Sequence, residues 1–214
     1  MPISSSTVNQ KLKPALFVIL FMPAMWLAMQ WLSRSLGLTN GLGFNPIEYT
    51  NRYLGDWALR ILILALAMRP MQIMSGSVLP IRLRRMTGLI AFTYVSLHVS
   101  SYLAIDLFFD WQAFWKDVLK RNFITLGMIN FTLLLPLVAT SNKRMVKRLG
   151  GVLWQRLHRV VYVINILAVI HFMMMVKGNQ LEPKIYMGIV FLLLGIRVFD
   201  AARKKRPKER QAAL

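Results

Sequence analysis

The sequence contains no cysteine among its 214 residues. This absence excludes disulfides, thiolate-bound iron–sulfur clusters, cysteine-rich zinc sites and the covalent Cys-x-x-Cys-His attachment of c-type haem. Histidine, methionine, arginine and oxygen groups are left as the possible ligands of a metal. The sequence also lacks a glycine-rich phosphate loop or a dinucleotide-binding fingerprint, so we expect no nicotinamide site in this chain.

Acidic residues are scarce as well. Eight Asp and Glu stand against 27 Lys and Arg, which gives a formal net charge of +19. The basic residues occur in short clusters between apolar runs and do not line one helical face or an arm, so membrane topology explains them better than nucleic acid, and we expect no nucleic-acid partner. Together with a hydrophobic content of 56%, this pattern predicts an integral membrane protein.

The apolar residues form six segments that approach the roughly 20 residues needed to cross about 30 Å of hydrocarbon. We therefore expect an all-α bundle of six transmembrane helices. The second segment is the shortest and contains Arg60, which we expect to snorkel or to face a polar interior. The first is too long for a secretory signal core and is expected to be retained. The predicted spans are 14–32, 54–69, 86–106, 123–140, 153–176 and 184–200.

Positive charge alternates between successive loops. The N-terminus, the loop between the second and third spans, the segment 143–159 and the tail from Arg203 hold 18 Lys and Arg, whereas the opposite loops hold seven. Because basic residues are retained on the cytoplasmic side, both termini should be cytoplasmic. The expected organisation is a cytoplasmic N-terminus (1–13), a transmembrane domain (14–200) and a basic cytoplasmic tail (201–214) that anchors to lipid headgroups.

The three histidines of the chain all fall within predicted spans. His98 lies thirteen residues beyond Arg85 in the third span, and His171 lies twelve beyond Arg159 in the fifth. At a helical rise of about 1.5 Å per residue, these histidines lie roughly 20 and 18 Å inward from the cytoplasmic ends of two helices that run in the same direction. Two imidazoles at one depth can bind one haem iron axially.

The third histidine, His158, lies at a different level. It is roughly 20 Å below His171 by the same helical rise, near the cytoplasmic surface, and has no histidine opposite it. Arg84, fourteen residues before His98, is at the matching depth. A second cofactor would therefore lie between His158 and Arg84. Three roles are open for Arg84: an unusual axial ligand, a propionate partner or an ordinary cytoplasmic charge.

Other uses of these histidines are open at this point. A tetrahedral zinc site is disfavoured because the histidines lie at two depths, whereas zinc needs three or four converging ligands. A proton-coupled or metal-ion transporter is the main alternative, since histidine chains occur in pumps. Such a relay usually recruits intramembrane acids, and Asp56, Asp106 and Asp200 all fall at the boundaries of predicted spans. A purely structural membrane anchor is a second alternative.

Short motifs carry a family resemblance over all six spans. They are PIRLRRMTGL (80–89), SLHVSSY (96–102), RNFITLG (121–127), QRLHRVVY (155–162) and AVIH (168–171). In this order and spacing they resemble the MsrQ family, formerly YedZ, the haem-binding membrane subunits of bacterial periplasmic methionine sulfoxide reductase systems. That family belongs to the broader ferric-reductase-like transmembrane proteins.

The resemblance implies a multi-pass b-type cytochrome of the bacterial inner membrane. Such a subunit passes electrons from the quinone pool or a cytosolic flavin reductase to a periplasmic molybdenum-containing reductase of the MsrP type, and has no catalytic residues for methionine sulfoxide itself. The resemblance implies one or two b haems, and FMN as a further cofactor. The family's iron-ligand positions match His98, His158 and His171, and Arg84 stands where the broader family has a second histidine on the third helix.

Overall fold

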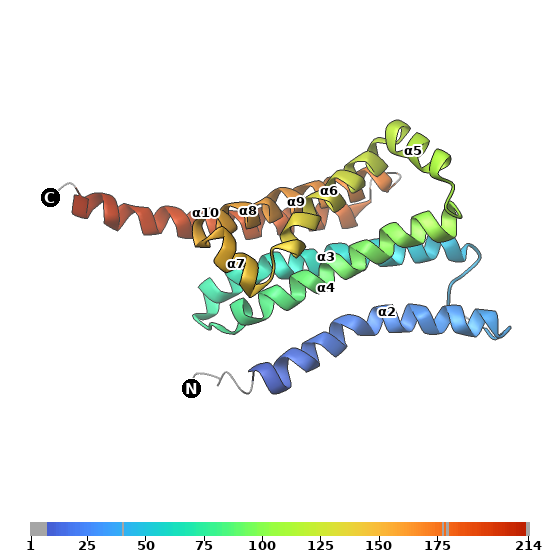
Figure 1. Ribbon diagram of the computed structural model, residues 1–214, viewed down its shortest axis with the longest axis horizontal. Helices are drawn as coiled ribbons and strands as arrows, with labels where there is room; N and C mark the ends of the chain where they lie inside the picture. Colours follow the sequence, from blue (N-terminus) through green and yellow to red (C-terminus); the bar gives the residue numbers. More distant parts are fainter. Residues whose placement is uncertain (1–7, 40, 177, 179, 213–214) are drawn as a thin grey trace.

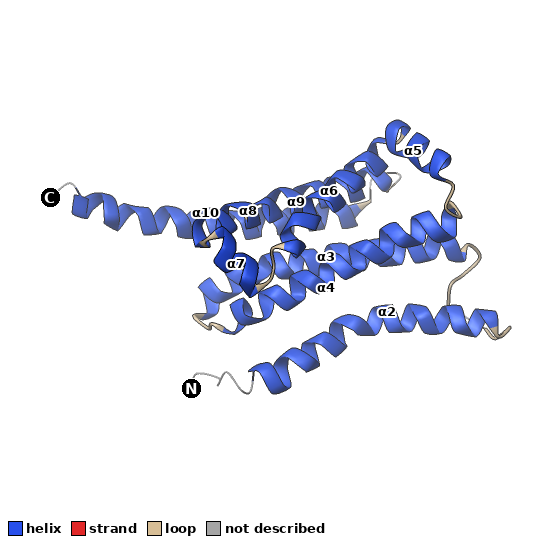
Figure 2. Ribbon diagram, viewed as in Figure 1, coloured by secondary structure: helices blue, strands red, loops and turns tan. Residues whose placement is uncertain are grey.

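The computed structural model describes residues 8–39, 41–176, 178 and 180–212. Within these residues the chain consists of helices joined by short loops, with no strand (Figure 2). Six helical segments are long and apolar enough to cross a membrane, which confirms the predicted all-α, six-span fold class. These segments are Gln10–Ser35, Pro46–Ser75, Leu79–Asp106, Asn122–Ala139, Gly151–Met175 and Leu181–Lys204.

The elements run up and down along one long axis. The first elements are η1 (Val8–Leu12), α2 (Lys13–Ser35), α3 (Pro46–Ser75), α4 (Leu79–Ser101) and η2 (Tyr102–Asp106). They are followed by α5 (Trp111–Lys120), α6 (Asn122–Ala139), α7 (Lys143–Leu149), α8 (Gly151–His158), α9 (Val160–Met175) and α10 (Leu181–Ala212). Figure 1 shows the start of α2, the end of α10 and α7 at one end of the bundle, and α5 at the opposite end.

The second span is longer than the sequence predicts. Helix α3 starts after Asn45, whose side chain accepts a hydrogen bond from the Glu48 amide, and ends before Gly76, which adopts a φ of 66°. In this helix 50% of the most apolar window is buried, against 6–22% in the other spans. Polar residues lower the apolar signal of this helix, and some of them, such as Asn51, bond to other helices. Asp56, expected at a span boundary, therefore lies well inside one, which corrects that expectation.

Partly buried arginines connect α3 to α10. The Arg60 Nε donates to the Tyr186 hydroxyl at 2.9 Å, and an Arg60 amino group lies 3.5 Å from a Glu182 carboxylate oxygen. Nearer the other end of α10, Arg197 donates to the Leu66 carbonyl at 2.5 Å. Arginines inside a span are stable when they have such partners within the protein. Arg60 is thus held by partners on α10, and its side chain remains 40% exposed.

Helix α2 is attached through an inserted tyrosine hydroxyl. Pro23 interrupts α2, and proline disrupts the helical hydrogen bonds of the preceding turn. The amide of Ala24 donates to the Tyr94 hydroxyl at 3.0 Å, and that hydroxyl donates to the Leu20 carbonyl at 2.8 Å. The hydroxyl thus bridges two backbone groups four residues apart, which pair directly in a regular helix. Tyr94 is fully buried, so this α4 residue completes the broken turn of α2.

We expect Tyr94→Phe to weaken the attachment of α2. The substitution leaves the Ala24 amide and the Leu20 carbonyl without their partner, which costs about 1–3 kcal/mol of stability. The measurement is the thermal unfolding of the detergent-solubilised protein, together with the rate of proteolysis within residues 36–44.

A matched control is Tyr49→Phe, which removes a hydroxyl from another tyrosine of the same partly buried aromatic cluster. Equal unfolding temperatures for the Tyr94 and Tyr49 variants would show that the inserted hydroxyl contributes nothing.

Candidate functional site

His98 of α4 and His171 of α9 meet in the interior of the bundle. Their ring centroids are 6.5 Å apart and their planes are inclined at 78°. The two imidazoles therefore share one level, as the estimate from helical rise predicts. Each is held by a different neighbouring helix, α3 for His98 and α6 for His171.

The His98 ring is positioned by the backbone of α3. Its Nδ1 lies 2.9 Å from the carbonyl oxygen of Asn51, and because a carbonyl only accepts, Nδ1 carries the proton. This close approach depends on Gly55, one helical turn after Asn51. A Cβ at Gly55 would lie 3.2 Å from the His98 Cε1 atom, so the missing side chain provides the space for the ring. We call this arrangement a glycine notch.

His171 lies in a second glycine notch of the same design. Its Nδ1 is 2.6 Å from the carbonyl oxygen of Phe123 in α6. Gly127 follows Phe123 by four residues, and a Cβ there would lie 3.0 Å from the His171 Cε1 atom. Both imidazoles thus donate through Nδ1 to a carbonyl one turn before a glycine. In each ring, Nε2 keeps its lone pair for a metal ion.

The spacing of the rings fits two axial ligands of one metal ion. With metal–nitrogen bonds of about 2 Å on both sides, the centroids of two opposed imidazoles are expected about 6 Å apart, close to the observed 6.5 Å. A cavity of about 680 Å³ adjoins both rings, a size typical of cofactor sites. Apolar side chains of α3, α4, α6 and α9 form much of its wall, Leu62, Val95, Leu134 and Ala168 among them.

The cavity has a polar rim toward the end of the bundle that carries α5. Arg52 of α3, and Tyr102 and Arg121 from the segments before and after α5, line this part. The Tyr102 hydroxyl donates to Asp117 of α5 at 2.6 Å, and the other Asp117 oxygen lies 3.2 Å from the Arg121 Nε. The rim therefore joins α5 to the histidine cavity and brings two guanidinium groups to its mouth.

The environment of His158 differs from that of the paired histidines. Its ring stacks on Trp154 with centroids 4.1 Å apart, and its Nε2 lies 3.1 Å from the Thr140 hydroxyl oxygen. Thr140 donates its own proton to the Pro136 carbonyl at 2.6 Å, so the hydroxyl accepts from Nε2. Nδ1 is then the His158 nitrogen left with a lone pair. His158 does not line the cavity between the other two histidines.

Arg84 is close enough to His158 for its positive charge to act on the imidazole. It is partly buried, and the like charges of Arg69 and Arg197 also act on it. Arg69 has an ion pair with Asp200 at 3.2 Å, whereas Arg84 forms none with a described residue. The sequence therefore identified a real neighbour of His158, although the neighbouring arginines of α3 and α10 were not anticipated.

Comparisons with known proteins match this architecture. Residues 54–169 fit the family model of the ferric reductase like transmembrane component. The chain is 45% identical over 192 residues to the protein-methionine-sulfoxide reductase heme-binding subunit MsrQ of Rhodospirillum rubrum, which covers 90% of this chain and 89% of that protein. The chain belongs to the MsrQ family. An MsrQ protein of Caulobacter vibrioides is 45% identical over 183 residues, 86% of this chain and 84% of that protein.

The MsrQ-like unit also occurs within a longer protein. The magnetosome protein MamZ of Magnetospirillum gryphiswaldense is 39% identical over 195 residues, 91% of this chain and 30% of MamZ. The family resemblance stated from short motifs is thus confirmed over nearly the whole chain. The ferric-reductase match includes His98 and the two notch glycines, Gly55 and Gly127, and it ends two residues before His171.

We expect Gly127→Ala to destabilise the folded protein by about 1–3 kcal/mol, the usual cost of overpacking a close contact. The new methyl group would meet the His171 ring at 3.0 Å, so the ring or helix α6 must move. Gly55→Ala should act in the same direction, because its methyl would meet the other ring at 3.2 Å. Thermal unfolding in detergent measures both effects.

Gly88→Ala in α4 is the control, because a Cβ there meets no atom within 4 Å. In a helix this control substitution should be neutral or stabilising. If all three variants unfolded at the same temperature, the notches would not be close-packed.

Proposed function

We propose that this chain is a b-type cytochrome subunit that carries electrons across the bacterial inner membrane to a periplasmic methionine sulfoxide reductase of the MsrP type. The observation that carries the proposal is the pair of imidazoles at 6.5 Å, each with Nδ1 bound to a backbone carbonyl. Membership of a family whose named proteins are heme-binding subunits supports the same conclusion. In this role the chain delivers electrons and leaves the reduction of methionine sulfoxide to its partner.

His98 and His171 would hold the outer haem through their Nε2 atoms. Haem supplies one-electron redox chemistry when bound, and the protein sets its ligation, burial and orientation. The carbonyls of Asn51 and Phe123 fix the imidazole tautomers and increase the basicity of the ligands. The cavity wall is largely apolar. At its rim, the guanidinium groups of Arg121 and of Arg52, which also pairs with Glu48 at 2.8 Å, would bind negatively charged propionates.

A second haem at the inner level would use His158 as its histidine ligand. The Nδ1 of His158 is the nitrogen left free by the Thr140 hydrogen bond. Arg84 has no ion pair with a described residue, so a bound carboxylate would satisfy its charge. We therefore favour Arg84 as a propionate partner over Arg84 as an axial ligand. A group of arginines near one imidazole also suits an anionic cofactor better than a bare metal cation.

The direction of transfer follows from the loop charges. Residues 1–13 and the tail 201–214 would face the cytoplasm, where the quinone pool or a cytosolic flavin reductase supplies electrons. The α5 end, next to the His98–His171 cavity, would face the periplasmic partner. FMN, which the family resemblance also implies, has no recognisable motif in this sequence.

One observation favours the alternative of a proton-coupled or metal-ion transporter. Asp56 lies inside α3 and lines the same cavity as His98 and His171, so an acid is available within the span. The described residues nevertheless contain no group of three or more His, Cys, Asp or Glu that converges as a metal site requires. A measurement of haem content distinguishes electron transfer through haem from transport.

We expect His98→Ala and His171→Ala each to remove or shift the Soret band and the sharp reduced-state bands of the outer haem. Each substitution deletes one of two axial ligands and leaves a gap beside the porphyrin. Absorption spectra and pyridine-haemochrome quantitation of the purified protein provide the measurement.

Val163→Ala, a substitution on an exposed face of α9, is the control and should retain full haem content. Folded wild-type protein that is colourless when purified from haem-replete cells would favour the transporter.

For the inner level we expect His158→Ala to abolish one haem signal and to spare the outer one. Arg84→Gln should retain the inner haem and shift its midpoint potential, because a positive charge near the propionates would be lost. Spectroelectrochemical titration with haem quantitation measures both, and Lys147→Gln serves as an inner-face control that leaves both signals unchanged. If His158→Ala kept the wild-type haem content and titration, only the outer haem would be present.

A further inference from the structure

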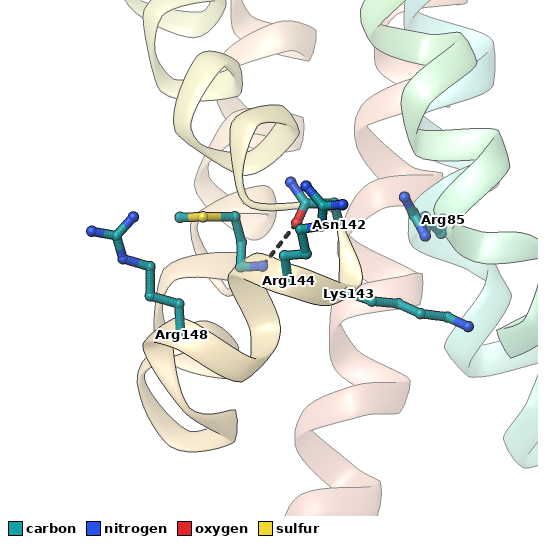
Figure 3. Close-up of a pocket in the computed structure, with 6 residues that line it drawn as sticks. Arg85, Asn142, Lys143, Arg144 and Arg148 are labelled. Carbon is teal, nitrogen blue, oxygen red and sulfur yellow. Dashed lines mark hydrogen bonds between the residues drawn. The ribbon is translucent and has the colours of Figure 1, made fainter.

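A basic cavity of about 670 Å³ lies between the inner end of α4 and helix α7 (Figure 3). It is lined by Arg85, Asn142, Lys143, Arg144, Met145 and Arg148. We call it the basic inner pocket. It is at the end of the bundle where α2 begins and α10 ends (Figure 1). The rim beside α5 lies at the opposite end of the long axis of the bundle.

The lining of this pocket contains four cationic side chains and no acidic one. Arg85 comes from α4, and Lys143, Arg144 and Arg148 come from α7, so two distant segments of the sequence line one pocket with positive charge. None of the four forms an ion pair with a described residue. Like charges around one pocket repel, and a bound anion would offset that repulsion.

The segment that carries these charges is held in place. The Asn142 side chain accepts from the Met145 amide at 2.8 Å and caps α7. Its amino group also donates to the Ala139 carbonyl at 3.2 Å, and the Trp154 indole donates to the Thr140 carbonyl at 2.9 Å. The loop is thus fixed to the ends of α6 and α8. A site arranged in advance loses less entropy when it binds a ligand.

The position of the pocket suits a lipid headgroup. Asn142 lies three residues beyond the end of α6, and Arg85 lies in the second turn of α4, so the pocket is at the depth of the membrane interface. The neighbouring helix α8 exposes Val152 by 70% and Leu153 by 54%, an apolar surface along which acyl chains can pack. A soluble phosphate would use the charges and leave this apolar surface unused.

We propose that the basic inner pocket binds the phosphate headgroup of an anionic phospholipid of the inner leaflet. Basic pockets between helices on the cytoplasmic side recognise such headgroups. The site is separate from the histidine cavity, so the proposal is independent of haem. A free phosphate compound shares the headgroup chemistry, and the experiment must separate these two sources.

The test is native mass spectrometry of the full-length protein, delipidated in a neutral detergent and titrated with phosphatidylglycerol or phosphatidylcholine. Each basic residue near an anionic lipid contributes about a fivefold gain in binding. The variant Arg85→Gln/Arg144→Gln/Arg148→Gln should therefore bind phosphatidylglycerol on the order of 100-fold more weakly. The wild-type protein should retain phosphatidylglycerol in preference to phosphatidylcholine.

Two further variants keep the test decisive. Lys11→Gln/Lys13→Gln/Lys147→Gln removes three charges from the same end of the bundle, outside both the pocket lining and the basic tail, and should bind phosphatidylglycerol like the wild type. The charge-conserving triple Arg→Lys variant at positions 85, 144 and 148 should keep most of the affinity, which separates loss of charge from misfolding.

The proposal is overturned if the pocket and control variants lose equal affinity. It is also overturned if inorganic phosphate at millimolar concentration displaces the lipid, since the site would then recognise phosphate from solution.

Discussion

The hydrogen bond from an imidazole Nδ1 to a helix carbonyl is the interaction on which the proposed haem site depends. It fixes the ring orientation and leaves the lone pair of Nε2 for a ligand. Such a bond needs close approach between a side chain and a neighbouring helix, which a Cβ at the facing position would prevent. Gly55 and Gly127 provide that approach, so the chemistry of the site depends on two absent side chains.

Helix α3 has the central structural role because it lies between other helices and carries polar groups that bond to them. Its Asn51 carbonyl holds His98, and the Asn51 side chain accepts from Ser101 at 2.6 Å. One and two turns further along, Asp56 lines the cavity and Arg60 bonds to α10. A span with this many polar groups is stable because other helices surround it, and α4 above all packs along it. The arrangement of α3 therefore determines where both α4 and α10 lie.

The sequence predicted the features that depend on periodicity and spacing along one helix. Six apolar runs gave the spans, and helical rise placed His98 and His171 at one level. The length of α3 was missed because Arg52, Asp56 and Arg60 lower its local hydropathy, although Asp56 and Arg60 are partly buried and Arg60 bonds to α10. The partners of the imidazoles were missed for a different reason, since they are backbone carbonyls of helices whose facing sides no single sequence reveals. A usable signal was present in the equal four-residue spacing of Asn51–Gly55 and Phe123–Gly127.

The two candidate sites, at the level of His98 and His171 and at the level of His158, differ in the physical interactions that shape them. At the level of His98 and His171, shape dominates, because glycine notches and an apolar wall define one geometry. At the level of His158, charge dominates, because the positive charge of Arg84 acts on the imidazole and the like charges of Arg69 and Arg197 act on Arg84. The orientation rule for membrane proteins concentrates basic residues on the cytoplasmic side, so the proposed inner cofactor would be surrounded by positive charge without any dedicated arrangement. A positive surrounding stabilises added electrons, whereas the proposed outer haem would depend on the two imidazoles that hold it.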